Sequence, residues 1–550
     1  MLVGSQPLPS EYHTGLSLWD YLVVALYGIG VIAIGAHYSR RQSNLGDYFL
    51  GGRKLNPVVV GISTMATLVS TISYLTLPGE IIKHGFGVLW AVTSIVPAYF
   101  VIGYLIIPRI MQQEVVSGYQ LLEARFGPTI RQAAACLFVL IRIAWVGLVV
   151  YTCGVALSAM TGWPLEYLLL GVGIVTTFYT VLGGIQAVVV TDVVQALILF
   201  LGAVGVVLFS MWKCGGVTAW WPNLGLPEVK AGLNWSHVPL VSFSMAVRIS
   251  VIGMILHQFM WWILTASSDQ LAIQRYLSTR DAKAARKSFL VNGIANTIVS
   301  IFLALTGIAL LGFFLTSARS APPLGDLLPS HTSHTVAQLT TKAASMSDLQ
   351  RRAFVLAQGA DKVFPWFIAH VLPAGLSGLL LAALFSAAMS SVSSGINSIT
   401  SVIMVDFPRA FVRFAEDSAK VKAARWLGVG VGLTTTGISF LLQHIRGNFM
   451  DVAQKINLFF VAPLGALFFM AFFVKCANKY GGWAAIVSGF LVGLIMAYYG
   501  ELYSWLTGSE IQATFTYTLA ASFLASIAAG YLFSRLLSRF EPLSKKKRSV

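Results

Sequence analysis

Residues 381–402 read LAALFSAAMSSVSSGINSITSV, an apolar stretch interrupted by hydroxyl and amide side chains. The stretch belongs to a longer run, 374–404, that can cross a bilayer, because about 20 apolar residues suffice for a membrane helix. Its polar side chains gather within a short segment, and they are Ser390, Ser391, Ser393, Ser394, Asn397 and Ser398. Polar groups are costly in a membrane interior, so this density needs an explanation.

The composition of the whole chain indicates a membrane protein. Of 550 residues, 56% are hydrophobic and 11% are charged, whereas soluble domains carry roughly 25% charged residues. The mean hydropathy is +0.76. A chain with so little polar surface is not a soluble enzyme, a disordered chain or a coiled coil. A net charge of +16 can indicate nucleic-acid binding in a soluble protein. In a membrane protein it indicates basic loops beside anionic lipid, so we expect no nucleic-acid partner.

Continuous apolar runs rich in Leu, Ala and Gly predict helices, because a membrane β-barrel would show alternating strands of about ten residues. We therefore predict an all-α polytopic membrane protein with about 13 transmembrane helices. The predicted spans are 16–37, 57–78, 86–108, 132–160, 163–182, 187–211, 241–266, 289–317, 374–404, 426–443, 454–474, 482–500 and 512–534.

The basic residues of the connecting segments predict the orientation. Lys and Arg gather in alternate connections, which are 40–54, 109–131, 275–287, 409–425 and 475–479, and in the tail 535–548. Cytoplasmic segments carry such an excess. We therefore expect the N-terminus outside and the C-terminus inside, in a multi-pass protein of the cell membrane. A bacterial inner membrane is the expected location, with a eukaryotic plasma membrane as the alternative. In the outer loop 318–372, Ser345–Gln358 has helical character and could form a lid.

Two of the spans are unusually rich in hydroxyl groups. The second, GISTMATLVSTISYLTLPGE (61–80), is either a helix whose hydroxyls bond to its own backbone or an unwound helix whose freed carbonyls face a site at the membrane midplane. In the ninth, Ser390, Ser394 and Asn397 share one face at 100° per residue. Close helix packing is the alternative there, but packing needs only small residues. Hydroxyl and carbonyl oxygens suit a hard cation, which favours an ion site.

Two charged residues also lie within predicted spans. Asp192, in TVLGGIQAVVVTDVVQ (180–195), is either a snorkelling or helix-capping carboxylate or a cation ligand. Arg142, in LFVLIRIAWVG, either snorkels to the cytoplasm or binds the carboxylate of a solute, for which a guanidinium is well suited.

Several segments together resemble the sodium:solute symporter family, which includes sodium–glucose, sodium–iodide, multivitamin, monocarboxylate, proline and sialic acid transporters. The segments are DYFLGGRKL (47–55), the second span, TFYTVLGGIQAVVVTDVVQ (177–195), DQLAIQRYLS (269–278) and ALFSAAMSSVSSGINS (383–398). The resemblance implies a leucine-transporter-like fold of two inverted five-helix repeats, each with a broken first helix. The implied organisation is an extra helix and inner loop (1–56), the first repeat (57–211), an outer loop (212–240), the second repeat (241–474), and two further helices with a basic tail (475–550).

The resemblance also implies sodium (Na+) as the coupling ion. The first sodium site would use backbone carbonyls of the second span and hydroxyls of the ninth, at Ala66, Val69, Ala387, Ser390 and Ser391. Some members, including the sialic acid transporter, have a second site, whose matching positions are Asp192, Ser390, Ser393 and Ser394. Every ligand type is present, so we expect two sodium ions per cycle; the alternative is a vestigial second site.

The solute is expected to be a small organic anion of the sialic acid or monocarboxylate type. Positions that bind galactose in the bacterial sugar transporter correspond to Ser73, Val92, Trp262 and Asn296, where an acid and an amide have been lost. The segment 73–90 is similar to the iodide, multivitamin and monocarboxylate branch instead. A sugar or another neutral solute is the alternative. The candidate solute contacts are Ser70, Ser73, Arg142, Gln258 and Trp262.

The expected activity is import of this solute with sodium by alternating access, by a protein that is not an enzyme and acts as a monomer in the lipid bilayer. The sequence has no Walker motif and no HExxH, which disfavours an ATP-driven pump and a metalloprotease. A transporter-like sensor and an uncoupled channel are the alternatives from other functional classes.

Overall fold

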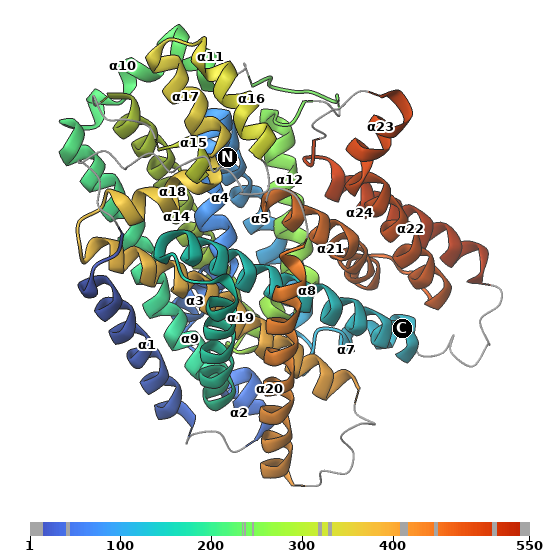
Figure 1. The fold of residues 1–550 in the computed structure, drawn as a ribbon. Helices are drawn as coiled ribbons and strands as arrows, with labels where there is room; N and C mark the ends of the chain where they lie inside the picture. Colours follow the sequence, from blue (N-terminus) through green and yellow to red (C-terminus); the bar gives the residue numbers. More distant parts are fainter. Residues whose placement is uncertain are drawn as a thin grey trace.

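The structure is a computed structural model, and it describes residues 15–39, 44–233, 235, 238–244, 247–316, 322–327, 333–407, 416–444, 449–508 and 514–538. These residues form helices and connecting loops, with no strand in the described ranges, so the all-α prediction is confirmed. The helices gather into a bundle, with α22 (Lys479–Ala497), α23 (Tyr499–Thr507) and α24 (Thr518–Leu536) at one side (Figure 1). The expected basic tail lies mostly outside the described residues.

The first half of the chain, up to the second predicted repeat, is helical almost throughout. Its helices are α1 (Leu18–Ser39), α2 (Leu45–Leu50), α3 (Pro57–Leu68), α4 (Thr71–His84), α5 (Ile95–Val101), α6 (Ile107–Met111), α7 (Gln120–Phe126), α8 (Pro128–Thr161), α9 (Leu165–Cys214), α10 (Trp221–Leu224) and α11 (Pro227–Leu233). A 3-10 segment, Gly85–Ser94, joins α4 to α5, and a π-helical turn, Ile102–Ile106, joins α5 to α6.

The second half alternates long helices with shorter ones. Its helices before α22 are α12 (Val251–Ser268), α13 (Gln270–Leu277), α14 (Ala282–Thr316), α15 (Leu324–Leu327), α16 (Ser333–Ala344), α17 (Asp348–Gln358), α18 (Ala360–His370), α19 (Leu376–Asp406), α20 (Asp417–Leu442) and α21 (Phe449–Phe473).

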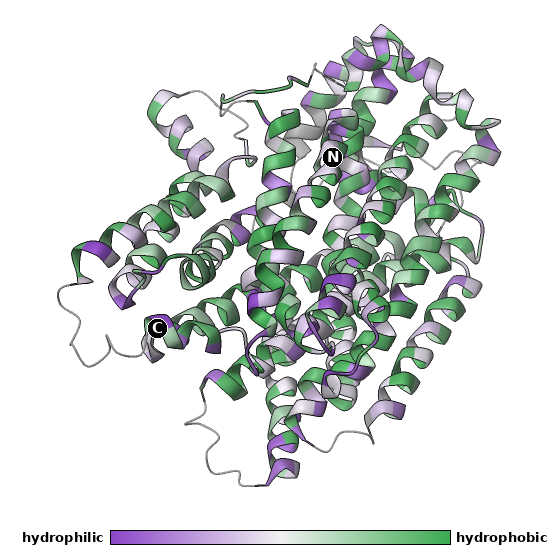
Figure 2. Ribbon diagram, turned by 180° about the vertical axis from the view of Figure 1, so that it is seen from behind, coloured by the Kyte–Doolittle hydropathy of each residue, from purple (hydrophilic) through white to green (hydrophobic). Residues whose placement is uncertain are grey.

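In the described part of the chain, 10 helical stretches are long and apolar enough to cross a membrane. Leu165–Cys214 contains the fifth and sixth predicted spans, and Thr71–Met111 contains the third together with the last eight residues of the second. The tenth predicted span falls on α20, which is not among the 10. Hydrophobic residues predominate along the long helices, and hydrophilic ones gather at helix ends and loops (Figure 2). The count of 13, the orientation and the two inverted repeats stay predictions.

The second predicted span is broken in the middle. Helix α3 ends at Leu68 and α4 begins at Thr71, while Val69 (ψ 85°) and Ser70 (ψ 174°) are not helical. The unwound helix suggested by the hydroxyl-rich sequence is therefore present. A helix that ends leaves the carbonyls of its last turn without amide partners, so this break frees carbonyl oxygens inside the bundle.

The predicted start of the seventh span, 241, is wrong by ten residues, whereas its predicted end is within two residues of the end of α12. Its helix, α12, begins at Val251, where the Ser250 hydroxyl accepts a hydrogen bond from the amide of Gly253 at 3.2 Å. Residues 241–244 and 247–250 are not helical, and Arg248 in this stretch pairs with Glu80 at 3.3 Å. The break expected in this span lies beyond its predicted end, at Asp269, between α12 and α13.

A glycine bends α9. Gly184 has φ 56° and ψ −164°, a backbone conformation that residues with a Cβ atom rarely adopt. The bend separates the fifth predicted span from the sixth and sets the direction in which Asp192 enters the bundle.

The described part of the loop predicted to lie outside, 318–372, is mostly helical. The segment predicted as Ser345–Gln358 contains α17, whose first turn is capped by the Ser347 hydroxyl. The next helix, α18, packs on α4, where Lys83 and Asp361 form an ion pair at 3.1 Å. The loop is therefore attached to the helix that follows the break in the second span.

Helix α19, which carries the serine cluster, lies at the centre of the bundle and packs against α9, α8, α1 and α3 (Figure 1). The extra helix α1 holds its N-terminal end. One carboxylate oxygen of the buried Asp20 accepts hydrogen bonds from the amides of Gly375 (2.8 Å) and Gly378 (2.7 Å). These amides have no partner within their own helix, so Asp20 satisfies them.

We expect Asp20→Ala to lower the free energy of unfolding by about 1–3 kcal/mol, because two buried amides lose their acceptor. Asp20→Asn keeps one carbonyl oxygen and should lose less. Thermal unfolding in detergent measures both. Equal melting temperatures for Asp20→Ala and the unchanged protein would show that α1 does not support α19.

Candidate functional site

A fully buried ion pair lies at the centre of the bundle. Asp192 of α9 and Arg275 of α13 are joined at 3.0 Å between a carboxylate oxygen and a guanidinium nitrogen. The carboxylate also accepts hydrogen bonds from the hydroxyls of Ser63 (2.6 Å) and Ser390 (2.7 Å). Asp192 has no exposed surface, so it does not snorkel, and it lies inside α9, so it does not cap a helix; both of those interpretations are wrong.

Arg275 joins the remaining helices of this cluster. Its guanidinium donates to the hydroxyls of Thr67 at 2.7 Å and Ser394 at 2.6 Å. Helices α3, α9, α13 and α19 therefore meet around one ion pair whose charges are both hydrogen-bonded. A buried ion pair is tolerated only when its remaining hydrogen-bonding groups are satisfied in this way.

One expected ligand of the first sodium site, Ser391, contacts the end of α3. The Ser391 hydroxyl donates to the carbonyl of Thr67 at 2.8 Å, which fixes α19 against the last turn of α3. Ala66 and Val69 flank that carbonyl along the chain, and Ala387 lies one turn before Ser391 on α19. All of these residues are buried. The arrangement offers carbonyl and hydroxyl oxygens, which suit a hard cation.

Three of the four expected ligands of the second sodium site also meet. Asp192, Ser390 and Ser394 all belong to the cluster around Arg275. The fourth, Ser393, donates its hydroxyl to the carbonyl of Ser390 in its own helix, at 3.1 Å. Arg275 was not among the predicted site residues, although it lies in the segment DQLAIQRYLS. The available signal was an arginine inside one of the segments that carry the family resemblance.

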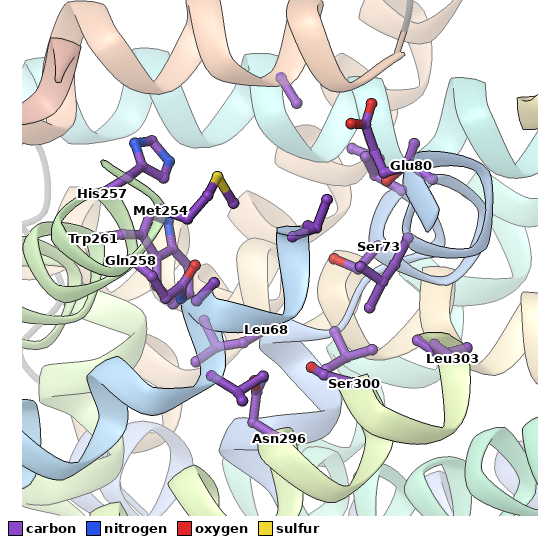
Figure 3. A pocket seen from close by; sticks show the side chains of 18 of the residues that line it. Leu68, Ser73, Glu80, Met254, His257, Gln258, Trp261, Asn296, Ser300 and Leu303 are labelled. Atoms are coloured by element: carbon purple, nitrogen blue, oxygen red, sulfur yellow. The ribbon is translucent and has the colours of Figure 1, made fainter. Parts of the chain in front are cut away.

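A cavity of about 210 Å³ lies beside the break between α3 and α4. Figure 3 shows Gln258 and His257 of α12 facing Ser73 and Glu80 of α4 across it, with side chains of α14 on a third side. The polar residues in its wall include Ser73, Thr76, Glu80, His257, Gln258, Asn296, Ser300, Gln454 and Asn457. The other lining residues are mostly apolar, as in sites for small organic ligands.

The predicted solute contacts separate into two groups. Ser73, Gln258 and Trp262 line this cavity. Ser70 and Arg142 do not, and the buried Ser70 hydroxyl has no described hydrogen-bond partner.

Arg142 forms an ion pair with Asp269, the residue at the break between α12 and α13. The two residues border a smaller cavity that shares Trp145, Leu68 and Trp261 with the larger one. The other carboxylate oxygen of Asp269 accepts a hydrogen bond from the amide of Leu271 at 2.9 Å and so begins α13. Arg142 therefore turns inward to Asp269 instead of reaching the membrane surface.

Glu80 is the cavity residue that the predicted contacts missed. It is 2% exposed and pairs with Arg248 at 3.3 Å, and the Nε2 atom of His84 lies 3.6 Å from its other carboxylate oxygen. The signal was the end of the second span, SYLTLPGE, where an acid follows directly after an apolar stretch. Its pairing with Arg248 connects α4 to the non-helical segment before α12.

We expect Arg275→Gln to destabilise the protein by about 3–5 kcal/mol, because it leaves the Asp192 carboxylate buried without its cation. In Arg275→Gln/Asp192→Asn the pair is replaced by neutral groups, so the loss should be smaller than the sum of the two single losses. Unfolding in sodium-free potassium buffer measures this difference. Arg280→Gln, at an exposed arginine, is the control with the same charge change. Additive losses would refute the coupling of the two residues.

Proteins of known function are similar to nearly the whole chain. The sodium-dependent multivitamin transporter of Oryctolagus cuniculus is 28% identical over 494 residues, which is 88% of this chain and 70% of the relative. The sodium/sialic acid symporter SiaT of Proteus mirabilis is 25% identical over 496 residues, 88% of this chain and 90% of the relative. The sodium-coupled monocarboxylate transporter 1 of Homo sapiens is 25% identical, over 88% of this chain and 74% of the relative.

Solved structures show the same fold. A substrate-bound, outward-open Na+-coupled sialic acid symporter superposes with a TM-score of 0.74 at 23% identity, over 94% of this chain and 98% of that one. Mhp1, a nucleobase-cation-symport-1 family transporter in a closed conformation, superposes with a TM-score of 0.50 at 12% identity, over 90% and 95%. The chain is thus similar in structure to transporters of the leucine-transporter-like fold. The profile of the Sodium:solute symporter family matches residues 48–489, and the chain belongs to that family.

Proposed function

We propose that this protein imports a small organic anion together with two sodium ions by alternating access. The observation that carries the proposal is the position of Val69. This residue lies at the break between α3 and α4, lines the solute cavity, and is an expected carbonyl ligand of the first sodium site. A cation bound at this break would fix the same backbone that forms the wall of the cavity. Ion and solute binding would then be coupled, and the coupling would be reciprocal.

The first sodium ion is proposed to bind between the end of α3 and the middle of α19. The supporting contact is the hydrogen bond from the Ser391 hydroxyl to the Thr67 carbonyl, which holds the two helices at ligand distance. Carbonyl and hydroxyl oxygens carry no net charge, so a monovalent cation keeps its charge in the site. That charge is what couples binding to the membrane potential, at about 2.3 kcal/mol per 100 mV.

The second sodium ion is proposed to bind at Asp192 with Ser390, Ser393 and Ser394. Arg275 already contacts Asp192 and Ser394. Two cations on the same oxygens repel each other strongly in a buried site. Binding of the second ion therefore requires the guanidinium to move away from Asp192, which would change the contact between α13 and α19 during the cycle.

Two observations support an anionic solute. The similar proteins include transporters named for sialic acid and for monocarboxylates, both of which carry a carboxylate. In this chain, Arg142 lies behind the cavity wall formed by Trp145. A solute carboxylate could take the place of the Asp269 carboxylate on the Arg142 guanidinium, since both are held by the same charge-assisted hydrogen bonds.

A neutral solute is the second candidate. It is favoured by the two ion pairs near the cavity, Arg142 with Asp269 and Glu80 with Arg248. Each pair has no net charge, so no unpaired charge is left to attract an anion. The neutral polar groups Ser73, Gln258 and Asn296 would then orient the solute by hydrogen bonds. The two candidates differ in whether Arg142 exchanges its partner on binding.

Replacing Ser391 with Ala should raise the sodium concentration for half-maximal uptake roughly 10-fold, because one ligand and its hydrogen bond to Thr67 are lost. The control is Ser398→Ala on the same helix, whose hydroxyl bonds to the Gly395 carbonyl of its own helix at 3.0 Å. Uptake into proteoliposomes with a sodium gradient measures both. An unchanged sodium dependence in Ser391→Ala would refute the assignment of the first site.

The solute class is tested by thermal shift of the purified protein with sialic acids, monocarboxylates, vitamins, amino acids and sugars, in sodium and in potassium. A ligand of the folded state raises the melting temperature. We expect a carboxylate to stabilise the protein only in sodium, and Arg142→Gln to abolish this shift. Asp269→Asn, which frees the guanidinium, should increase it.

Stabilisation by a neutral compound that survives Arg142→Gln would favour the second candidate. Stabilisation by one compound equally in sodium and potassium would contradict sodium coupling, whichever solute is bound.

A further inference from the structure

A basic pocket lies at the start of α14, apart from the sodium cluster and the solute cavity. Its volume is about 740 Å³, and its wall combines residues 54–58, which lead into α3, with Tyr99 of α5 and the first turns of α14. Five cations and no carboxylate line it, and the cations are Lys54, Arg280, Lys283, Arg286 and Lys287. The buried charges Asp192 and Arg275, and Glu80 and Arg248, are paired with each other. The wall of this pocket has cations without carboxylates, so its positive charge needs a separate explanation.

One acid lies next to the pocket and neutralises one of its cations. Asp281 pairs with Arg280 at 3.1 Å, and its other carboxylate oxygen accepts a hydrogen bond from the amide of Ala284 at 2.7 Å. This amide holds the pKa of Asp281 below its ordinary value. Four positive charges remain around the pocket, and they attract an anion.

The cations of the pocket are arranged on a fixed support. The Arg286 guanidinium lies over the ring of Tyr104, 4.3 Å from its centroid, which holds this side chain against the turn between α5 and α6. Lys54, Lys283 and Lys287 are exposed, and none of them forms an ion pair with a described carboxylate. Three flexible ammonium groups therefore surround one anchored guanidinium.

The same pocket has an apolar side. Leu55, Val58 and Leu290 contribute to its wall, and Leu290 is 39% exposed. From Leu290, exposed aliphatic side chains continue along one face of α14, at Ile294, Ile298 and Ile301. Helix α14 is a candidate membrane span, so this stripe faces lipid tails. A ligand that fills the whole site carries an anionic group at one end and hydrocarbon at the other.

We propose that this pocket binds the headgroup of an anionic phospholipid, with an acyl chain lying along Leu290, Ile294 and Ile298. The phosphodiester would contact Lys283, Lys287 and Arg286, since basic pockets at the ends of membrane helices recognise such headgroups. Because the pocket joins the start of α3 to the start of α14, a bound lipid would link the two helices that carry Ser63 and Asn296. With the predicted orientation, this lipid belongs to the inner leaflet.

The chain offers a matched control for general electrostatic attraction. Lys420 and Lys422, near the start of α20, are also predicted to face the inner leaflet, but they line none of the described pockets. Lys420 is paired with Asp417 at 2.9 Å. If basic residues attract anionic lipid only through the surface potential, both lysine pairs should contribute alike.

The experiment compares lipid binding to the delipidated full chain by native mass spectrometry, with phosphatidylglycerol and phosphatidylcholine of equal chains. We expect Lys283→Gln/Lys287→Gln to weaken phosphatidylglycerol binding roughly 25-fold, at about fivefold for each lysine. Lys283→Arg/Lys287→Arg should keep the affinity. Lys420→Gln/Lys422→Gln should change it less than twofold. Melting temperatures without lipid identify any variant that has lost its fold. If the Gln pair has lost its fold, the Lys283→Arg/Lys287→Arg variant tests the site, and a loss of phosphatidylglycerol affinity in this folded variant would contradict the proposal.

Glycerol 1-phosphate distinguishes a lipid from a soluble anion. It shares the phosphate chemistry but lacks acyl chains, and we expect it to compete only weakly with phosphatidylglycerol. Complete competition at similar concentrations would overturn the lipid assignment in favour of a free phosphate compound. Equal losses in the two Gln pairs, or equal binding of phosphatidylcholine and phosphatidylglycerol, would overturn the proposed site.

Discussion

The ion pair of Asp192 and Arg275 is the constraint on which the centre of the structure depends. Both charges are removed from solvent, and in a membrane protein the surrounding lipid offers no compensation. The hydroxyls of Ser63, Thr67 and Ser394 must therefore complete the hydrogen bonding of the pair. This requirement fixes the relative positions of α3, α9, α13 and α19. It also explains why serine and threonine, and not only small apolar residues, lie where these helices cross.

Two of the helices that contact this pair, α3 and α13, end or begin at a helix break. The break at Val69 and Ser70 ends α3 and frees carbonyl oxygens next to Thr67. The break at Asp269 ends α12 and starts α13, the short helix that carries Arg275. Irregular backbone is tolerated at membrane depth only where its polar groups are satisfied by protein, ions or a polar cavity. The cavity lined by Val69 and the predicted sodium ligands lie beside the first break.

The sequence predicted features that have local signals. The serine repeat of α19, the break in the second span and the acid at Asp192 each stand out within about twenty residues of chain. It did not predict which charges pair, because Arg275 meets Asp192, and Arg142 meets Asp269, across large separations in sequence. The start of α12 was misplaced for the same reason. Arg248 looks like an interruption in an apolar run, and its partner Glu80 lies far away in the sequence.

The pairing of Arg142 with Asp269 bears on how an anion could be selected. An unpaired guanidinium inside a membrane protein is costly, so a resting partner stabilises the protein between transport events. A solute carboxylate must displace that partner, and its apparent affinity is reduced by the energy of the internal pair. A neutral solute gains nothing from the exchange and leaves the pair intact. Because Asp269 also begins α13, releasing its carboxylate would loosen the helix that holds Arg275 against Asp192. Solute binding near Arg142 and ion binding at Asp192 would thus act on the same short helix from its two ends.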